Sequence, residues 1–274
     1  MKYQVLFDST AFRRTLVSVA LAAAYSSSWA LPSFTLTPAN AGLTGAPVTA
    51  DNILVSDFAR VLFSDASHFT EDGFLSITGF QLGGANVSAP DLNTNYSLYL
   101  QYTGTAHATV GAGADPHTTF TGGLFDTLSY TFYGVSGNST FSVAGAASPS
   151  VNNSGNSPIV LTSGSLDPGS ISTFSSWPAN PNFSANAAAS LTFAVASASF
   201  FSPDPFYNIA ISAFTNPNST VTPFGIPGTA GSGFTINNGG GSINFASAVP
   251  EPETYALMLA GLGVVGFLTR RRRS

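Results

Sequence analysis

The stretch Tyr96-Ser97-Leu98-Tyr99-Leu100-Gln101-Tyr102-Thr103 shows the pattern that decides the fold of this chain. Its first, third, fifth and seventh residues are large and apolar, so they fall on one face of an extended strand. The polar residues fall mostly on the other face. The same alternation returns at residues 128–132 and 191–195, and it is typical of strands that bury one side.

Other apolar runs along the chain are short and indicate more strands. Residues 206–214 are apolar on both faces, which favours a central strand. The remaining candidate strands are residues 53–63, 74–82, 139–143, 159–161, 234–236 and 243–245. Turn sequences lie between these runs, namely Gly137-Asn138, Asp167-Pro168-Gly169 and Pro203-Asp204-Pro205. We therefore predict an all-β fold with an antiparallel β-sandwich or jelly-roll-like body.

Three stretches between the predicted strands have loop-like compositions. Residues 146–158 and 175–189 are expected to form long loops. The sequence Gly239-Gly240-Gly241-Ser242 could be a flexible linker, but the apolar Ile243 and Phe245 after it favour a hairpin turn.

The composition predicts a folded body without covalent cross-links. Hydrophobic residues make up 44% of the chain, including 23 Phe, 9 Tyr and 2 Trp, so there is enough apolar surface to bury. Cysteine is absent, which excludes disulfides, thiolate metal sites and a cysteine nucleophile. Stability must come from packing.

The C-terminal segment 250–274 combines three features that indicate a membrane. Pro250-Glu251-Pro252 cannot enter a helix and holds an extended shape. An uncharged apolar run follows at residues 255–268, and then the basic cluster Arg270-Arg271-Arg272-Arg273. The run is short for a membrane span, but four adjacent arginines favour the cytoplasmic side and seldom end a buried core helix. We predict a transmembrane helix with its C-terminal end inside the cell.

The N-terminal segment has the pattern of a secretory signal peptide. Lys2 and Arg13-Arg14 precede an apolar stretch at residues 16–25, and Ser28-Trp29-Ala30 places small residues where signal peptidase reads. We predict export by the Sec machinery and cleavage after Ala30. A twin-arginine signal is an alternative, although Phe12 stands where that motif has Ser or Thr. The chain is thereby divided into a signal peptide (1–30), an extracellular β-sandwich body (31–249) and a C-terminal sorting segment (250–274).

The predicted body is strongly acidic once both ends are set aside. It contains one basic residue, Arg60, and ten acidic residues, so its net charge is −9 with the histidines neutral. Such a surface repels phosphate backbones, and nucleic-acid binding is therefore excluded.

Histidines are few in this chain, and they give two hypotheses about a functional site. One of His68, His107 and His117 could join a Ser-His-Asp triad, because triads are set by geometry, but no motif singles one out. His107, Asp115 and His117 are ligand types suited to zinc. The glycine-rich segment between them indicates an exposed loop instead.

Acidic residues give two more hypotheses. A sugar-cleaving enzyme needs two carboxylates about 5 to 10 Å apart, and Glu71 and Asp72 are adjacent. In a strand they would point to opposite faces, but beside Gly73 we expect a solvated acidic turn. Calcium is a hypothesis for the acidic residues Asp51, Asp57, Asp65 and Asp72, although their spacing matches no calcium loop. We therefore expect no catalytic residue, no metal site, no cofactor and no enzymatic activity.

The sequence before the arginine cluster is Val249-Pro250-Glu251-Pro252-Glu253-Thr254-Tyr255-Ala256-Leu257-Met258-Leu259-Ala260-Gly261-Leu262-Gly263. Together with the cluster it resembles the PEP-CTERM sorting signal of Gram-negative bacteria. That resemblance implies processing by an exosortase, a membrane-embedded cysteine protease or transpeptidase, in bacteria that make extracellular polysaccharide. It implies that Pro250, Glu251 and Pro252 are the recognition motif and that this chain is the substrate. After passing through the inner membrane, the protein would reach the cell surface or the extracellular matrix.

Four segments of the body carry a second resemblance, namely Ala50-Asp51-Asn52-Ile53, Phe74-Leu75-Ser76-Ile77-Thr78-Gly79-Phe80-Gln81-Leu82, Tyr96-Ser97-Leu98-Tyr99 and Phe206-Tyr207-Asn208-Ile209-Ala210. They are similar to the flocculation-associated PEP-CTERM proteins of floc-forming bacteria. The resemblance implies a role in retaining extracellular polysaccharide, so that cells aggregate. A surface of Ser, Thr and Asn, with aromatics able to stack on sugar rings, is compatible with that role. The alternatives are a secreted polysaccharide-modifying enzyme and a lectin-like carbohydrate-binding module.

Overall fold

The computed structural model describes residues 31–109, 122–166, 173–174, 184–190, 192–193, 200–202, 208–214, 220–225 and 229–246. The predicted signal peptide and sorting segment lie outside these ranges. Within them the regular structure is β-strand, apart from one short 3-10 helix, η1 (Pro38–Ala41).

The strands of the described ranges are β1 (Phe34–Leu36), β2 (Val48–Ala50), β3 (Asn52–Phe63), β4 (His68–Leu82), β5 (Ala85–Val87), β6 (Tyr96–Thr109), β7 (Gly122–Ser136), β8 (Thr140–Ser142), β9 (Ser150–Asn152), β10 (Ile159–Ser165), β11 (Thr173–Phe174), β12 (Ser184–Ser190), β13 (Thr192–Phe193), β14 (Phe201–Ser202), β15 (Asn208–Phe214), β16 (Thr220–Phe224) and β17 (Gly233–Ala246).

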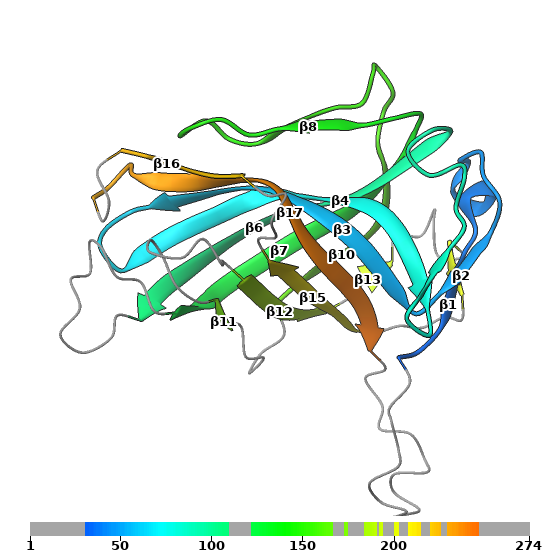
Figure 1. Ribbon diagram of the computed structural model, residues 1–274, viewed down its shortest axis with the longest axis horizontal. Helices are drawn as coiled ribbons and strands as arrows, with labels where there is room; N and C mark the ends of the chain where they lie inside the picture. Colours follow the sequence, from blue (N-terminus) through cyan, green and yellow to red (C-terminus); the bar gives the residue numbers. More distant parts are fainter. Residues whose placement is uncertain are drawn as a thin grey trace, which may run out of the picture. The chain divides into compact units, whose positions relative to one another are not determined.

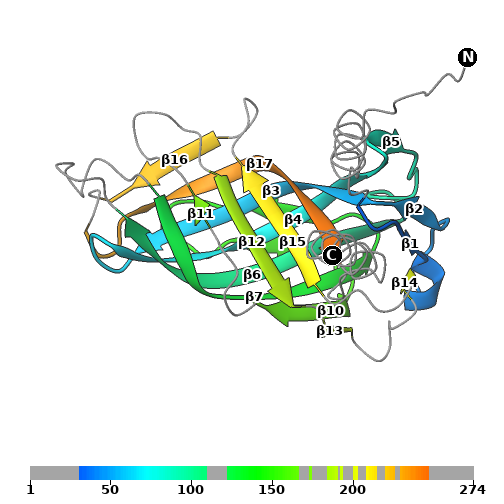
Figure 2. The ribbon, with the colours of Figure 1, turned by 90° about the horizontal axis from the view of Figure 1, so that it is seen from below.

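Most of these strands belong to one antiparallel sheet of 12 strands. Its order is β11-β12-β15-β17-β3-β4-β6-β7-β10-β13, with β16 on β17 and β5 on β4. Strand β11 also pairs with β7, through Phe174 and Gly123, so the sheet returns on itself. Figure 1 shows β12 and β15 below the layer of β3, β4 and β6, and Figure 2, seen from below, shows them in front of it. The predicted all-β, antiparallel, sandwich-like fold is confirmed.

The long central strands bury one face each, which is why their sequences alternate. Along β3, buried and partly exposed residues follow one another from Asn52 to Val61. The inward apolar residues of β3, β4, β6 and β7 include Ile53, Val55, Val61, Leu75, Ile77, Leu98, Leu100, Leu128, Tyr130 and Phe132. Burial of these side chains is the main source of stability in a chain without cysteine.

A separate three-stranded sheet, with the order β14-β1-β2, packs aromatic side chains into the same core. Phe34 and Phe201 lie edge-on to Phe245 of β17, with ring centroids 4.8 Å and 5.1 Å away. Phe132 of β7 stacks on Phe201 at 5.8 Å. These arrangements suit the ring quadrupoles, so aromatic packing fixes the small sheet to the large one.

The hairpin of β8 and β9 covers part of the outer face of the large sheet, and β8 is visible above it in Figure 1. Phe141 of β8 packs against Phe58, Phe74 and Tyr99, with ring centroids 5.3 Å, 5.5 Å and 5.5 Å away. Phe74 and Tyr99 point away from the main core and are nevertheless buried. The hairpin therefore creates a second, smaller aromatic core.

The glycine-rich stretch 239–242 does not form the expected hairpin turn. It lies inside β17 and pairs residue by residue with β3. A β-bulge between Asn237 and Gly239 accommodates the extra residue Asn238, whose φ is 63°. Glycine has a low strand propensity, but the neighbouring strands on both sides decide the conformation here.

Two expected loops also contain strands. Residues 184–190 form β12, which pairs along its whole length with β15, although they overlap the expected loop 175–189. The expected loop 146–158 contains the short β9. By contrast, the central strand expected within 206–214 is confirmed, because β15 pairs with both β12 and β17.

Candidate functional site

Two carboxyl groups and one phenol meet inside the body. Asp57 of β3 and Glu71 of β4 point into the core and are 2% and 1% exposed. The hydroxyl of Tyr102 on β6 lies 3.1 Å from Asp57 Oδ1 and 3.0 Å from Glu71 Oε1. Glu71 Oε2 has no hydrogen-bond partner in the described part of the chain. We refer to these three residues as the acid cluster.

The surroundings of the acid cluster favour protonated carboxyl groups. Arg60 is the single basic residue of the predicted body, and it bonds Asp72 on the opposite face of the sheet. Burial raises the pKa of Asp57 to about 7, although the hydrogen bond from Tyr102 opposes this shift. Burial also raises the pKa of Glu71 to about 8, and the charge of Asp57 adds to it. Glu71 therefore keeps its proton at neutral pH.

The acid cluster can store a proton, but its burial separates it from any polymer outside. Burial also raises the pKa of Tyr102 well above its ordinary value, so the phenol remains a hydrogen-bond donor. Paired carboxyls with raised pKa values are the groups that glycoside hydrolases use. Those enzymes place the pair where a sugar can reach it, and here both side chains lie within the core.

Sequence reasoning missed the acid cluster because its members are far apart along the chain. Only the pairing of β3 with β4, and of β4 with β6, brings Asp57, Glu71 and Tyr102 together. One signal was present in the sequence. Asp57 lies two residues from both Val55 and Ala59, which belong to the buried face of β3. Because alternate residues of a strand share a face, the alternation itself placed an acid in the core.

The expected acidic turn at Glu71-Asp72-Gly73 is wrong, since these residues lie within β4. The two acids point to opposite faces, as the strand alternative required. Asp72 faces outward, where its Oδ1 accepts hydrogen bonds from Arg60 Nη2 at 2.7 Å and Arg60 Nε at 3.0 Å. The Nη1 of Arg60 donates to the carbonyl of Ala146, which ties the β8–β9 hairpin to the sheet.

A groove of about 510 Å³ lies on the outer face beside this ion pair. Its floor consists mainly of polar residues of β4, β6 and β7, and one wall is the segment Ser148-Pro149 between β8 and β9. We refer to it as the outer groove. The polar floor residues are Thr70, Asp72, Gln101, Thr103, Ser129 and Thr131.

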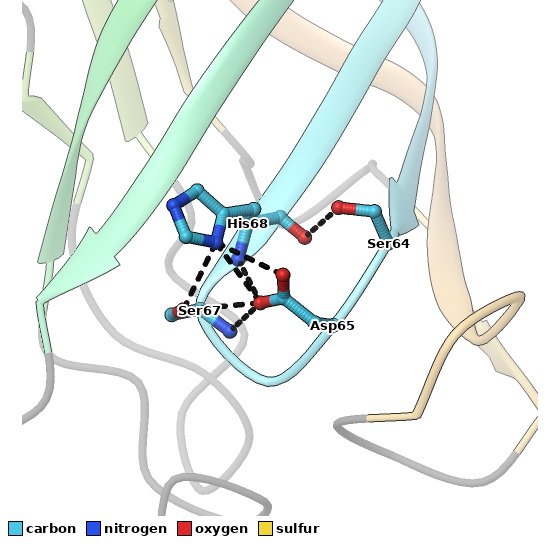
Figure 3. Close-up of polar contacts among 4 residues, drawn as sticks. All are labelled: Ser64, Asp65, Ser67 and His68. Carbon is cyan, nitrogen blue, oxygen red and sulfur yellow. Dashed lines mark hydrogen bonds and ion pairs between the residues drawn. The ribbon is translucent and has the colours of Figure 1, made fainter.

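The turn between β3 and β4 brings Ser, His and Asp together, but not as a catalytic triad (Figure 3). Asp65 Oδ1 accepts backbone hydrogen bonds from Ser67 at 2.7 Å and His68 at 2.9 Å, and these bonds, together with one from the His68 side chain, lower the pKa of Asp65. Nδ1 of His68 lies 3.1 Å from Ser67 Oγ and 3.0 Å from Asp65 Oδ1. A triad needs the hydroxyl and the carboxylate at opposite ring nitrogens. The contacts therefore stabilise a turn.

The zinc and calcium hypotheses are not supported by any group of ligands in the described residues. His107 lies in β6, where its Nδ1 is 2.7 Å from Asp126 Oδ1, while Asp115 and His117 lie outside the described residues. In the described ranges no three potential ligands gather around a common point. Asp51 accepts a hydrogen bond from the backbone of Gly83, Asp57 is in the core, and Asp65 and Asp72 occupy the turn and the outer face. These four acids do not come together.

The comparison that identifies the C-terminal tail is a match to a family model described as PEP-CTERM protein-sorting motif, over residues 248–273. The chain carries a PEP-CTERM sorting motif. The matched residues include Pro250-Glu251-Pro252 and the cluster Arg270-Arg271-Arg272-Arg273. The motif marks an exported protein of a Gram-negative bacterium, with a membrane-anchored sorting signal that targets it to an exosortase. Export by the Sec pathway follows from the same motif.

Searches of the curated proteins and of the solved structures find no significant match. The individual roles of Pro250, Glu251 and Pro252, and cleavage after Ala30, stay predictions, because these residues lie outside the described ranges. None of the helices found in those ranges has the length and apolar character to cross a membrane. The predicted transmembrane helix also lies outside them.

Proposed function

We propose that this exported protein retains extracellular polysaccharide, without enzymatic activity, so that cells aggregate into flocs or biofilm. After exosortase processing it resides at the cell surface or in the extracellular matrix. The observation that carries the proposal is the outer groove, which offers hydroxyl and amide groups to a hydrated polymer on the face of an exported β-sandwich.

The charge of the protein favours a polymer that does not need cations for binding. The predicted body has a net charge of −9, and its single basic residue, Arg60, already pairs with Asp72. An anionic polymer would meet repulsion rather than a basic patch. Hydrogen bonding to neutral sugar units remains as the main source of affinity.

The described aromatic residues contribute less to the surface than the composition suggests. The largest fully buried side chains include Tyr96, Tyr99, Phe34, Phe80 and Phe234. Phe74, which lines the outer groove, is only 3% exposed beneath the hairpin. Stacking of sugar rings on aromatics is therefore a minor contribution at this groove, and hydrogen bonds take its place.

Two mutant strains test the proposal. One lacks the protein, and the other carries alanines at Pro250, Glu251 and Pro252. We expect both strains to clump less than the parent and to release more polysaccharide into the medium, measured by sedimentation and by assay of the cell-free polymer. Restoring the unchanged gene should restore both properties. Unchanged clumping and retention in the deletion strain would overturn the proposal.

A polysaccharide-modifying enzyme is the second candidate function, and the acid cluster is the observation that favours it. Asp57 and Glu71 share one hydroxyl and have raised pKa values, as an acid-base pair would. Incubating the purified protein with polysaccharide from the parent strain distinguishes the two functions. We expect no new reducing ends. Their appearance with the parent protein, and their loss with Glu71→Gln, would favour the enzyme.

A further inference from the structure

We propose that the outer groove binds an uncharged polysaccharide chain through two rows of polar side chains that run across the strands. This inference rests on the proposed function for the class of polymer and for the groove, and it adds the two rows of side chains that hold the polymer.

The strand register aligns the floor of the groove in rows. The first row runs from Asp72 on β4 through Thr103 on β6 to Ser129 on β7. The second row runs from Gln101 on β6 through Thr131 on β7 and continues to Ser163 on β10. Neighbouring strands lie about 4.8 Å apart, so each row offers polar groups at a regular interval. A polymer of repeating hydroxylated units can contact several of them in succession.

The polar groups of these rows are available to a ligand. In the part of the chain that the structure describes, the side chains of Gln101, Thr103, Ser129 and Thr131 make no hydrogen bond with other residues. Both Arg60 nitrogens that bind Asp72 approach its Oδ1, which leaves Oδ2 as an acceptor. Sugar hydroxyls can replace water as the hydrogen-bond partners of these side chains. A hydrogen bond to the carboxylate oxygen of Asp72 would be the strongest of these bonds.

The charges in and around the groove favour binding of an uncharged ligand. Among the described residues that line it, Arg60 and Asp72 are the only charged ones, and they form an ion pair with an N–O distance of 2.7 Å. The groove itself is therefore close to neutral, while the surrounding body is acidic. An anionic chain would be repelled by the body. A cationic chain would be attracted by the body, but in the groove it would find the carboxylate of Asp72 already paired with Arg60.

The wall of the groove is held in place before any ligand arrives. Arg60 donates a hydrogen bond to the carbonyl of Ala146, close in sequence to the wall residues Ser148 and Pro149. Phe141 packs on Phe58 and Phe74 at the foot of the same hairpin. A preformed groove reduces the entropy lost on binding, and about 510 Å³ lies within the size range of sites for small ligands. It would hold a short segment of a longer chain.

The test compares two double variants of the exported protein. Thr103→Val with Thr131→Val removes one hydroxyl from each row, while valine keeps the size and the strand preference of threonine. Thr78→Val with Thr222→Val is the matched control, since both threonines are exposed strand residues away from the groove. The probes are the neutral and acidic fractions of the parent strain's extracellular polysaccharide, separated by anion exchange and immobilised for binding measurements.

We expect the parent protein and the control to bind the neutral fraction equally, and the groove variant to bind it about tenfold more weakly. Thermal unfolding followed by circular dichroism confirms that all three are folded. Equal binding by the groove variant, or stronger binding of the acidic fraction by the parent protein, would overturn the proposal.

The same variants separate this inference from the proposed function. If the deletion strain sheds its polysaccharide and the groove variant restores full retention, the proposed function holds and the groove is not its site. If the deletion strain retains its polysaccharide, the proposed function itself is wrong. If the control variant restores retention and the groove variant does not, both are supported.

Discussion

Among the described residues, Tyr102 supplies the one hydroxyl that Asp57 and Glu71 share in the core, so two acids depend on one hydrogen-bond donor. A phenol donates a single hydrogen and can satisfy one carboxyl oxygen at a time. The second carboxyl must therefore be protonated or remain without a donor. Burial raises the pKa of both acids, and the hydrogen bonds from Tyr102 oppose this shift only in part.

Replacing Tyr102 by phenylalanine tests the importance of this donor. Tyr102→Phe keeps the ring and leaves two buried carboxyl groups without their common partner, which we expect to lower the free energy of unfolding by about 1–3 kcal/mol. The loss should be larger at alkaline than at acidic pH, because ionised carboxylates need the donor more. Urea denaturation followed by circular dichroism measures it. A variant as stable as the parent protein would contradict the assigned hydrogen bonds.

The pKa values of the acid cluster also predict how stability depends on pH. In the unfolded chain Asp57 and Glu71 titrate near their ordinary values of 3.8 and 4.5, and in the folded protein near about 7 and about 8. Between these limits the folded protein binds more protons than the unfolded chain. Stability is therefore fully present below the lower pair of values, and it falls as the pH rises through the upper pair.

Glu71→Gln tests this dependence, because glutamine keeps the shape of the side chain and cannot ionise. Relative to the parent protein, we expect the variant to lose less stability between about pH 5 and about pH 9, and to be the more stable of the two at about pH 9. Denaturant midpoints at several pH values provide the measurement. Parallel pH profiles for the two proteins would show that Glu71 does not titrate in this range.

At the scale of elements, close contact between strands makes some glycines irreplaceable. A Cβ added to Gly233, the first residue of β17, would lie 1.9 Å from the carbonyl oxygen of Val61 on β3. A Cβ at Gly79 on β4 would meet only Leu54 Cδ1, at 3.8 Å. The neighbouring backbone therefore comes much closer to Gly233 than to Gly79.

This difference gives a matched pair of variants. Gly233→Ala should force β17 away from β3 and lower the free energy of unfolding by about 1–3 kcal/mol or more. Gly79→Ala should change it by less than about 0.5 kcal/mol. Thermal or urea denaturation compares the two. Similar stabilities for both variants would show that the β3–β17 pairing is looser than the structure indicates.

One ring, Phe141, supplies the aromatic contacts that help to attach the β8–β9 hairpin to the sheet. Phe141→Ala removes the contacts with Phe58, Phe74 and Tyr99, so we expect faster hydrogen exchange in residues 138–153 and a smaller effect in the main core. Mass spectrometry of exchanged peptides measures both regions. Unchanged protection in the hairpin would mean that Arg60 and the strand ladder suffice to hold it.

Elements were predictable from sequence where one face is buried and the other is wet. The strands β3, β4, β6 and β7 follow that rule. Alternation located β6 and β7, and apolar runs located β3 and residues 74–82 of β4. Strand β12 is rich in alanine, and residues 239–242 of β17 are mostly glycine, so neither carries an apolar signal. Their conformation is set by hydrogen bonds to neighbouring strands. The acid cluster escaped prediction for a related reason, because it requires the register of three strands.

At the scale of the whole molecule, the fold class was predictable but the closure of the sheet was not. Strand alternation and turn sequences together indicated an antiparallel β-sandwich or jelly-roll-like body. The pairing of β11 with both β12 and β7 joins residues far apart along the chain, and no local pattern reports such contacts. The sorting motif needed no structure, since its order of proline, apolar run and arginine is written in consecutive residues.

The acidity of the predicted body predicts how salt affects contact with polymers. At low salt, a net charge of −9 should repel the acidic polysaccharide fraction, and raising the salt to about 0.3 M should relieve the repulsion by shortening the Debye length. Binding to the neutral fraction should change little over the same range. Binding measurements across a salt series check both expectations. Weaker acidic-fraction binding at high salt would instead indicate a cationic contact.

The protons that Asp57 and Glu71 hold in the core also bear on the conditions in which such a protein stays folded. A body whose buried acids hold their protons is most stable in acidic surroundings. Alkaline pH would ionise both buried acids and lower the stability of the β-sandwich. Alkali used to strip a matrix from cells should consequently recover this protein unfolded, whereas gentle extraction in mild acid should deliver it intact.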